Sequence, residues 1–421
     1  MQRYESYKPS NAAWLGDVPS LWDVQPLRAV TSLKSDKNRP DLPVLSVYRE
    51  YGVILKNSRD DNHNATSLDT SNYKVVKPGD LVVNKMKAWQ GSMGVSAHHG
   101  VVSPAYITCT TKADRVRPAY LHYLLRSLPL IGVYNSLSYG VRVGQWDMHY
   151  EDFKQIPIPL PPKDEQDRIV AFLDQKTAEI DAAIAKKERL IELLQEQKNI
   201  RIHQAVLRGL NPEVPLCNSG VTWIGAVPAH WKVIPNRYIF REQNARSLRG
   251  EETHLSMSQR YGLVPAKELD VQTLQSESYD GAKLCQKGDL VQNRLKAHLA
   301  VFAVAPCDGL VSPDYSVFRL QNAQNQPVYF ERLFKTPNYL GEFNRRVRGI
   351  VVGFLRLYSE DFNAIPALVP PCDEQTEIVR FIEATNKEFE EIWAKIDAEI
   401  VMLRELKVIT VASAVTGKIK V

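Results

Sequence analysis

The sequence has few cysteines and none of the spacings that cysteine-dependent sites need. Its 421 residues include five cysteines, an odd number, and no two of them form a C-x-x-C pair. A disulfide framework or a structural zinc site requires such pairs, so we predict neither. We expect all five to be reduced side chains that contribute to packing: Cys109, Cys217, Cys285, Cys307 and Cys372.

Motifs of common catalytic sites are also missing. There is no G-x-x-x-x-G-K-[ST] phosphate loop, no G-x-G-x-x-G after a predicted strand, and no H-E-x-x-H. These motifs cradle phosphates, bind dinucleotides and hold a catalytic zinc ion, respectively. We therefore predict that the chain is not an enzyme on its own and that it holds no cofactor or metal.

Long hydrophobic runs are absent as well. No apolar run approaches about 18 residues, the length needed to cross a membrane. The opening MQRYESYKPS lacks the basic and apolar regions of a secretory signal. We expect a cytoplasmic protein without membrane contact, and a composition of 44% apolar and 24% charged residues is ordinary for a globular chain with several domains.

What the sequence does contain is a tandem duplication. WLGDVPSLW at residues 14–22 returns as WIGAVPAHW at 223–231, and PGDLVVNKMKA at 78–88 returns as KGDLVQNRLKA at 287–297. Both pairs are separated by 209 residues, as are several further segments. A period this long indicates two related domains rather than a solenoid.

A shorter segment in each copy predicts a long helix. After Pro162 no proline or glycine occurs until Gly209, and apolar residues recur near heptad spacing from Ile169 to Leu194. The second copy repeats this design up to Gly417. We expect the helices to begin at N-cap residues Asp164 and Asp373 and to span about 43 residues, or roughly 65 Å.

Each predicted helix has a single apolar stripe, which requires a partner. We predict that the two helices pair as an antiparallel intramolecular coiled coil, which would hold two globular parts a fixed distance apart. The alternative is that each helix docks separately on its own domain. The predicted division is residues 1–160 and 211–370 for the globular domains, and 161–210 and 371–421 for the helices.

The long segments indicate an α+β fold. LPVLSVYREYGVI, DLVVNKMKAW and VSPAYITCTT have the β-branched and aromatic residues of strands, bounded by Gly, Pro and Asp. RPAYLHYLLRSLPLI predicts a helix with Tyr120, Tyr123, Leu124 and Leu128 along one face. The order of the strands in a sheet does not follow from these patterns.

Positive charge is concentrated in the long segments. The net charge is +5 for the whole chain, but segment 161–210 is neutral and 371–421 is negative. A polyanion can use this asymmetry, because neutralising phosphates releases counterions and strengthens binding. An ordinary soluble surface is the alternative explanation.

Several motifs together resemble the specificity subunit of Type I restriction-modification systems. They are the W-[LI]-G-x-V-P-x-x-W opening, the G-D-L-V-x-N-[KR]-x-K-A segment, the E-D-F-x-x-I-P-x-x-x-P-P-x-D-E-Q passage into a long helix, and the A-V-T-G-K-I close. All but the close occur in both copies, in the same order. The resemblance implies two target recognition domains, each reading half of a bipartite site in double-stranded DNA, with two helices that set the spacing.

The resemblance also implies partners. In that family the subunit is non-catalytic and recruits methyltransferase subunits, here expected to be two, that use S-adenosylmethionine. Restriction subunits that use ATP and Mg complete the assembly. Two alternatives stay open: a stand-alone two-headed DNA-binding protein, and a nuclease with an unrecognised site.

Comparing the copies suggests which residues contact DNA. Cations kept in both copies suit phosphate contacts, and polar residues that differ within an aligned frame suit base readout. Three frames qualify: LSVYREYGV against LSMSQRYGL, NKMKAW against NRLKAH, and NSLSYGVRVGQW against NRRVRGIVVGFL. The predicted DNA-binding residues are Tyr48, Arg49, Lys85, Lys87, Trp89, Arg142, Gln145, Gln259, Arg260, Arg294, Lys296, His298, Arg345, Arg346 and Arg348.

Overall fold

The chain forms two compact units. The computed structural model describes residues 2–58, 69–140, 146–258, 262–268, 279–299, 301–349 and 355–421, except for the His298 side chain. Unit 1 comprises Met1–Glu188 and Ile396–Val421, and unit 2 comprises Arg189–Lys395. Each unit therefore contains part of both long helices, α4 (Lys163–Arg208) and α8 (Cys372–Val415). The predicted boundaries at 160, 210 and 370 stay a prediction.

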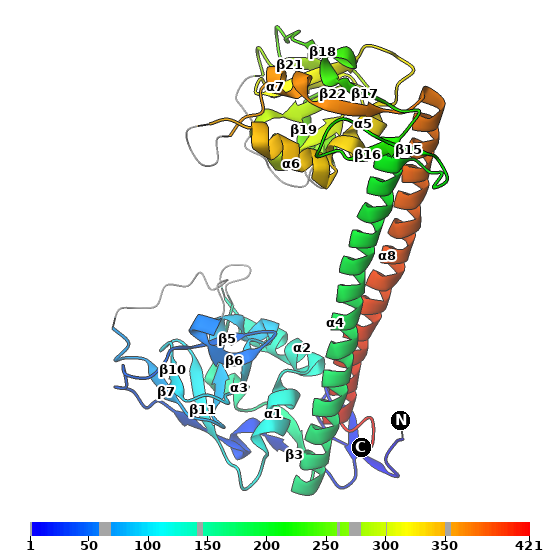
Figure 1. Ribbon diagram of the computed structural model, residues 1–421. Helices are drawn as coiled ribbons and strands as arrows, with labels where there is room; N and C mark the ends of the chain where they lie inside the picture. Colours follow the sequence, from blue (N-terminus) through cyan, green and yellow to red (C-terminus); the bar gives the residue numbers. More distant parts are fainter. Residues whose placement is uncertain are drawn as a thin grey trace. The chain divides into compact units, whose positions relative to one another are not determined.

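Unit 1 is an α+β structure built on short antiparallel strands (Figure 1). Its four-stranded sheet has the order β4-β11-β8-β9, and two-stranded sheets pair β1 with β2, β3 with β14, β5 with β6, β7 with β10, and β12 with β13. The strands are β1 Tyr7–Pro9, β2 Asp17–Pro19, β3 Asp23–Pro26, β4 Thr31–Lys34, β5 Leu45–Tyr48, β6 Gly52–Leu55, β7 Lys74–Val76, β8 Leu81–Val83, β9 Met93–Val95, β10 Gly100–Val102, β11 Ile107–Thr111, β12 Ser138–Tyr139, β13 Asp147–Met148 and β14 Pro157–Leu160. The helices are α1 Pro118–Leu125, α2 Leu128–Leu137 and α3 Tyr150–Phe153, with 3-10 turns η1 Leu27–Ala29, η2 Lys56–Ser58 and η3 Lys85–Gln90.

Unit 2 repeats this arrangement, as the duplication requires. Its four-stranded sheet has the order β18-β25-β22-β23, and β15 pairs with β16, β17 with β26, β19 with β20, and β21 with β24. The strands are β15 Leu216–Asn218, β16 Ala226–Pro228, β17 Lys232–Pro235, β18 Phe240–Gln243, β19 Leu255–Ser258, β20 Gly262–Pro265, β21 Lys283–Cys285, β22 Leu290–Asn293, β23 Phe302–Val304, β24 Gly309–Val311, β25 Tyr315–Leu320 and β26 Pro366–Val369. The helices are α5 Pro327–Phe334, α6 Pro337–Arg346 and α7 Ser359–Ala364, with 3-10 turns η4 Asn236–Tyr238, η5 Ala266–Glu268 and η6 Arg294–Leu299.

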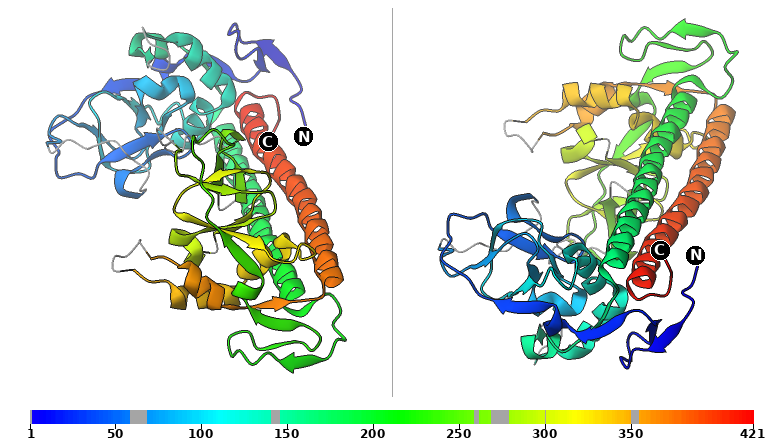
Figure 2. Two further views of the ribbon diagram at one scale, coloured as in Figure 1. Left: turned by 90° about the horizontal axis from the view of Figure 1, so that it is seen from above. Right: turned by 90° about the horizontal axis from the view of Figure 1, so that it is seen from below.

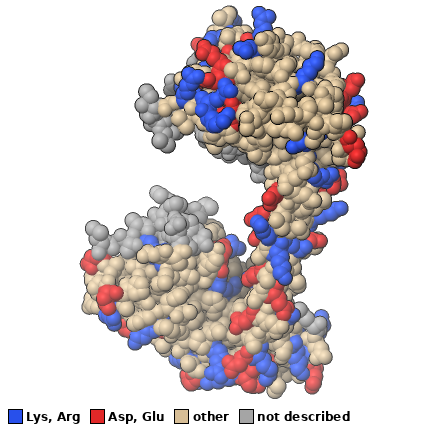
Figure 3. Space-filling view, in the orientation of Figure 1, with Lys and Arg blue, Asp and Glu red and all other residues tan. Residues whose placement is uncertain are grey.

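Helices α4 and α8 run antiparallel where they pair within each unit (Figures 1 and 2). In unit 1, Lys407 donates to both carboxylate oxygens of Asp181 at 2.7 Å, and Arg404 contacts Glu188 at 3.2 Å. In unit 2, Arg201 contacts Glu388 at 3.1 Å. Figure 3 shows basic and acidic side chains interspersed along the helices. The predicted antiparallel coiled coil within an α+β fold is confirmed, and separate docking of the helices is excluded.

The recurring D-E-Q sequence at the start of each long helix has a structural role. Gln166 is fully buried, and its side chain accepts the backbone N–H of Arg117 at 2.7 Å and donates to the Pro161 carbonyl at 2.9 Å. Gln375 makes the corresponding contacts in unit 2, with the Gln326 N–H and the Pro370 carbonyl. The repeated glutamine thus fixes the first turn of each long helix to its own unit.

Several local predictions were wrong. The helices begin at Lys163 and Cys372, one residue before the expected caps. The KMKAW end of one predicted strand is the 3-10 turn η3, because β8 ends at Val83. The predicted strand at residues 102–111 is interrupted between β10 and β11 by the S-P-A-Y segment.

Two side chains also differ from the prediction. Leu128 is not on the face of the first short helix, since α1 ends at Leu125 and Leu128 is 57% exposed at the start of α2. Cys217 is exposed rather than packed, whereas Cys109 and Cys285 are buried, and burial raises the pKa of both buried thiols to about 12. Among the described residues no helix has the length and apolar character that crossing a membrane would take.

Candidate nucleic-acid interface

The shared cations lie on matching 3-10 turns of the two units. Strand β8 leads directly into η3, where Lys87 leaves the helical conformation at φ −125°. Lys296 has the same kink in η6, at φ −122°. Both side chains are exposed, and among the described residues neither has an ion-pair partner. The turns therefore present one exposed ammonium group in each unit.

The other two shared cations are held by the protein. In unit 1, Lys85 forms an ion pair with Asp147 at 3.0 Å. In unit 2, the Arg294 guanidinium donates from Nε to the Asp314 carbonyl at 2.7 Å, and its Nη2 lies 3.7 Å from the Asp314 carboxylate. At the position of Asp147 the second copy has Arg356, which also approaches Asp314, at 3.6 Å. The two turns thus share a backbone path but differ in their charged neighbours.

Trp89 lies at the end of η3 and packs within unit 1. Its ring is half-buried and meets the Trp146 ring edge to face, with 5.3 Å between centroids. The indole Nε1 is buried and has no hydrogen-bond partner among the described residues. The side chain of the corresponding residue, His298, lies outside the described residues.

The Tyr48 and Arg49 frame forms the turn of the β5–β6 hairpin. Arg49 and Glu50 are exposed, and Gly52, at φ +72°, allows the chain to enter β6. Tyr48 packs edge to face against Tyr51 at 6.3 Å between centroids. In the second copy Ser258 ends β19, while Gln259 and Arg260 lie outside the described residues.

The third frame of unit 2 contributes cations in the last turn of α6 and just after it. Arg345 and Arg346 both pair with the buried carboxylate of Glu342, and Arg346 Nε lies 2.6 Å from it. Arg348 pairs with Asp361. Arg142 and Gln145, the corresponding candidates of unit 1, lie outside the described residues. Each of these three arginines is already paired with a carboxylate, so only part of its positive charge is available to a ligand.

Tyr106 connects the first two frames of unit 1. Asn84, immediately before η3, donates from Nδ2 to the Tyr106 hydroxyl at 3.4 Å. Tyr106 also packs against the hydrophobic cluster that includes Val47 of β5, next to Tyr48, and burial raises the pKa of the Tyr106 hydroxyl. The Trp89–Trp146 contact joins the third frame to η3, and the Lys85–Asp147 pair lies directly beside it in the sequence. The structure therefore brings the described parts of all three frames together on unit 1.

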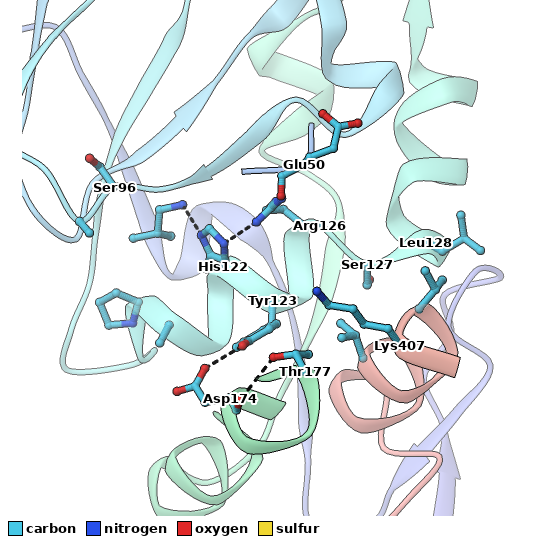
Figure 4. A pocket seen from close by; sticks show the side chains of 16 residues that line it. Glu50, Ser96, His122, Tyr123, Arg126, Ser127, Leu128, Asp174, Thr177 and Lys407 are labelled. Carbon is cyan, nitrogen blue, oxygen red and sulfur yellow. Dashed lines mark hydrogen bonds between the residues drawn. The ribbon is translucent and has the colours of Figure 1, made fainter. Parts of the chain in front are cut away.

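Behind the hairpin turn lies a pocket of about 660 Å³ (Figure 4). It is bounded by Glu50 of the turn, by residues of β9 and α1, and by parts of α4 and α8. Arg126, which follows α1, donates from Nη2 to the carbonyls of Arg49 at 2.7 Å and Glu50 at 2.6 Å. Its Nη1 lies 2.7 Å from His122 Nε2. Arg126 therefore fixes the backbone of the turn.

His122 is a partly buried imidazole between two donors. Besides Arg126, the backbone nitrogen of Val95 lies 3.3 Å from Nδ1. A neutral ring has one acceptor nitrogen, so only one contact is a hydrogen bond, and the shorter separation favours Arg126. Burial, followed by the Arg126 charge, lowers the pKa of His122 to about 4. The ring is therefore uncharged at neutral pH.

Unit 2 has a different pair at these positions. Glu331 accepts the backbone N–H of Val304 at 2.9 Å and pairs with Lys335 at 2.6 Å. A carboxylate has two acceptor oxygens, so it satisfies both donors. The exchange of histidine and arginine for glutamate and lysine, four residues apart in both copies, was a signal in the sequence that pointed to this paired site.

The described residues contain no group of three His, Cys, Asp or Glu side chains placed to hold a metal ion. The residues of the candidate site that the sequence did not indicate lie outside the aligned frames, namely Arg126, His122, Tyr106 and Asp147. They contact the backbone or the side chains of residues in the frames: Arg126 donates to the Arg49 and Glu50 carbonyls, and Asp147 pairs with Lys85. Comparing the two copies for divergent polar residues does not identify such supporting residues.

Comparisons with known proteins agree on one family. Residues 20–193 match the family described as Type I restriction modification DNA specificity domain. The chain is 23% identical over 437 residues to the Type I restriction enzyme EcoKI specificity subunit of Escherichia coli strain K12, covering 96% of this chain and 90% of that protein.

Two solved structures share the fold. A chain from work on complex assembly and conformational transition of the type I R-M system aligns with a TM-score of 0.65 at 13% identity, over 96% of this chain and 99% of that one. The HsdS subunit from Thermoanaerobacter tengcongensis aligns with a TM-score of 0.51 at 15% identity, over 96% and 98% of the two chains.

Proposed function

We propose that the chain is a specificity subunit of the Type I restriction-modification family, whose DNA specificity domain matches residues 20–193, and that it recognises a bipartite, asymmetric DNA site with a fixed gap. Each unit reads one half of the site. The helix pair α4–α8 sets the length of the unread gap. The two half-sites have different sequences.

One observation carries this proposal: the two units present matching frames with different side chains. The kinked turns η3 and η6 keep exposed Lys87 and Lys296, which suit phosphate contacts that orient a domain on DNA. Around them, Asp147 of unit 1 is replaced by Arg356 of unit 2. A constant docking element beside variable charged groups supports two domains that approach DNA alike and read different bases.

The partners are methyltransferase subunits, two per chain, and restriction subunits. Exposed apolar side chains on the long helices support a protein partner there, because isolated helices of a soluble protein seldom expose so many. In unit 1 these are Val401, Met402, Leu406, Val408 and Ile409, and in unit 2 they are Leu190, Leu193 and Ile200. Met402, Leu406 and Ile409 are spaced four and three residues apart, which places them on one helix face.

This chain catalyses no step in the proposed complex. The partner subunits use S-adenosylmethionine to methylate adenine, and ATP and Mg for restriction, in the cytoplasm. A stand-alone two-headed DNA-binding protein is the alternative, and it makes the opposite prediction about methylation.

The deciding experiment is co-expression with methyltransferase subunits encoded beside this chain in a host that lacks DNA methylation. Modified adenines are then mapped across the genome by single-molecule sequencing. We expect one motif with two defined halves and a constant gap. A stable complex that leaves the genome unmethylated would contradict the proposal and favour the stand-alone protein.

A modular exchange tests the assignment of the halves. Replacing residues 1–160 with the corresponding segment of another family member should change one half of the methylated motif and leave the other half intact. A change in both halves would contradict independent reading by the two units.

A further inference from the structure

The β5–β6 turn of unit 1 is held by a group outside the hairpin. The strand ladder ends where Tyr48 pairs with Gly52, so the three residues between them make no ladder bonds. Two of their carbonyls, those of Arg49 and Glu50, accept hydrogen bonds from the same Nη2 atom of Arg126. Hydrogen bonds from a charged donor are stronger than neutral ones. Arg126 is therefore a major restraint on the path of this turn.

The Arg126 side chain is itself oriented by its surroundings. Its Nη1 contacts His122 one helical turn earlier, and the His122 ring fits closely between two glycines. A Cβ atom at Gly52 would lie 2.9 Å from His122 Cε1, and one at Gly94 would lie 3.2 Å away. Any side chain at these glycines would displace the ring. The hairpin, β9 and α1 are thus fitted around one imidazole.

Helix α1 is in turn fixed to α4. Tyr123 donates to Asp174 at 2.7 Å, as Figure 4 shows, and Arg117 pairs with Asp167 at 2.7 Å. Continuous contacts therefore run from the backbone of the hairpin turn, through Arg126 and α1, to the long helix. These contacts fix the backbone positions of the exposed residues Arg49 and Glu50 relative to α4.

Unit 2 uses its cation differently. Lys335, at the position of Arg126, pairs with Glu331 at 2.6 Å. An ammonium group lacks the planar fork with which arginine contacts several acceptors at once. The position after the helix thus accepts lysine in unit 2, while in unit 1 one arginine reaches both the His122 ring and two carbonyls of the turn.

We infer that Arg126 is a positioning residue that determines specificity at the first half-site, because it fixes the turn that carries Arg49 and Glu50. The inference rests on the proposed function, since the turn must face DNA for its position to affect base readout. Arg126 acts through the backbone of the turn and need not touch DNA.

The test compares the wild-type chain with Arg126→Lys and Arg126→Gln, each co-expressed with methyltransferase subunits. The lysine variant keeps a side chain that the second copy accommodates at this position, so the fold should persist. We expect the preference for the cognate first half-site over single-base variants to fall about tenfold, the range of one lost base-specific contact. The second half-site should be read as before.

Matched controls separate positioning from general damage. Arg168→Lys alters an exposed ion pair with Asp164 within α4 and should leave the motif unchanged, and Lys335→Arg, at the equivalent position of unit 2, should leave the first half-site unchanged. An unchanged first half-site in both Arg126 variants would overturn the inference. So would equal loss at both half-sites, since that indicates a general defect.

Hydrogen exchange on the purified chain tests the restraint without DNA. Amides of residues 49–52 should exchange about tenfold faster in Arg126→Gln than in wild type, because two charge-assisted hydrogen bonds are lost. Unchanged exchange would overturn the positioning role even if the wild-type chain directs no methylation. If the wild-type chain directs no methylation but the Arg126→Gln variant exchanges faster, the proposed function would be rejected. The restraint of Arg126 on the β5–β6 turn would then still hold.

Discussion

The hydroxyl of Tyr120 lies 3.2 Å from the carbonyl oxygen of Val415, 295 residues further along the chain, and shares its proton between that oxygen and the Pro159 carbonyl at 3.1 Å. Val415 ends α8, where helix carbonyls lack partners within the helix. Tyr329 of unit 2 makes the same contact with Val206, near the end of α4, at 3.1 Å. A fully buried tyrosine thus holds the end of one long helix in each unit.

Removing either hydroxyl should destabilise the unit that contains it. We expect Tyr120→Phe and Tyr329→Phe each to lower the free energy of unfolding by about 1–3 kcal/mol, since each leaves a buried carbonyl without a donor. Urea unfolding with a probe in each unit measures the effect. Tyr139→Phe is the control, because the Tyr139 side chain is 58% exposed and should change the unfolding midpoint little.

The exposed lysines of η3 and η6 should contact phosphate rather than bases. Lys87→Ala and Lys296→Ala are expected to weaken binding to all DNA sequences alike. Each should reduce the slope of log affinity against log salt by about 1, since one fewer counterion is released. Fluorescence anisotropy at several salt concentrations, on the complex with methyltransferase subunits, provides the measurement.

Lys176→Ala serves as the control for those two variants. Lys176 lies on α4 and is paired with Glu179 at 2.7 Å, so its loss should leave the salt slope unchanged. A defect of Lys87→Ala confined to one base sequence would show direct base readout instead.

His122 should make folding of unit 1 sensitive to mild acid. Its pKa in the folded chain is about 4, because of burial and the nearby Arg126 charge, against about 6.5 for an unfolded histidine. The unfolded chain therefore binds more protons between these values. The stabilisation is fully present above pH 6.5 and is lost as the pH falls toward 4.

His122→Glu is the informative substitution, because Glu331 occupies this position in unit 2 and accepts from both neighbouring donors. We expect the variant to fold and to lose less stability than wild type between pH 7.5 and pH 5. The urea unfolding midpoints of wild type and variant at the two pH values measure this difference. The other histidines are present in both proteins, so their contribution to the pH dependence cancels. Parallel losses would show that His122 is not responsible.

The large-scale fold was predictable because it rests on repetition and periodicity. The heptad pattern located helices that the structure places at Lys163–Arg208 and Cys372–Val415, within two residues at most boundaries. The single apolar stripe correctly required a partner helix. The predicted strand extended too far at η3, where residues with little strand propensity follow β8 and Gly91, at φ +86°, closes a 3-10 turn.

The candidate site was predictable only in part. Alignment of the copies finds exposed residues such as Arg49 and Lys87, because they stand in shared frames. It does not reveal that Arg126, 77 residues after Arg49, holds that residue's carbonyl. Such contacts depend on the path of the chain between strands, and sheet order did not follow from the sequence pattern.

The helix pair offers a last test, on the length of the unread gap. Seven residues inserted after Glu188 and seven after Lys395 would extend both helices where the two units meet in the sequence. This choice keeps pairs such as Asp181–Lys407 and Arg201–Glu388 in register within each unit. It also keeps the apolar stripe in phase, because the stripe repeats nearly every seven residues.

Two helical turns add about 10.5 Å, which corresponds to about three base-pair steps. We therefore expect the methylated motif to keep both half-sites and to gain about three base pairs in the gap. Seven residues inserted after Glu188 alone are the matched control, since they put α4 and α8 out of register and should abolish methylation. A double-insertion variant that methylates the original motif would show that the helices do not set the gap.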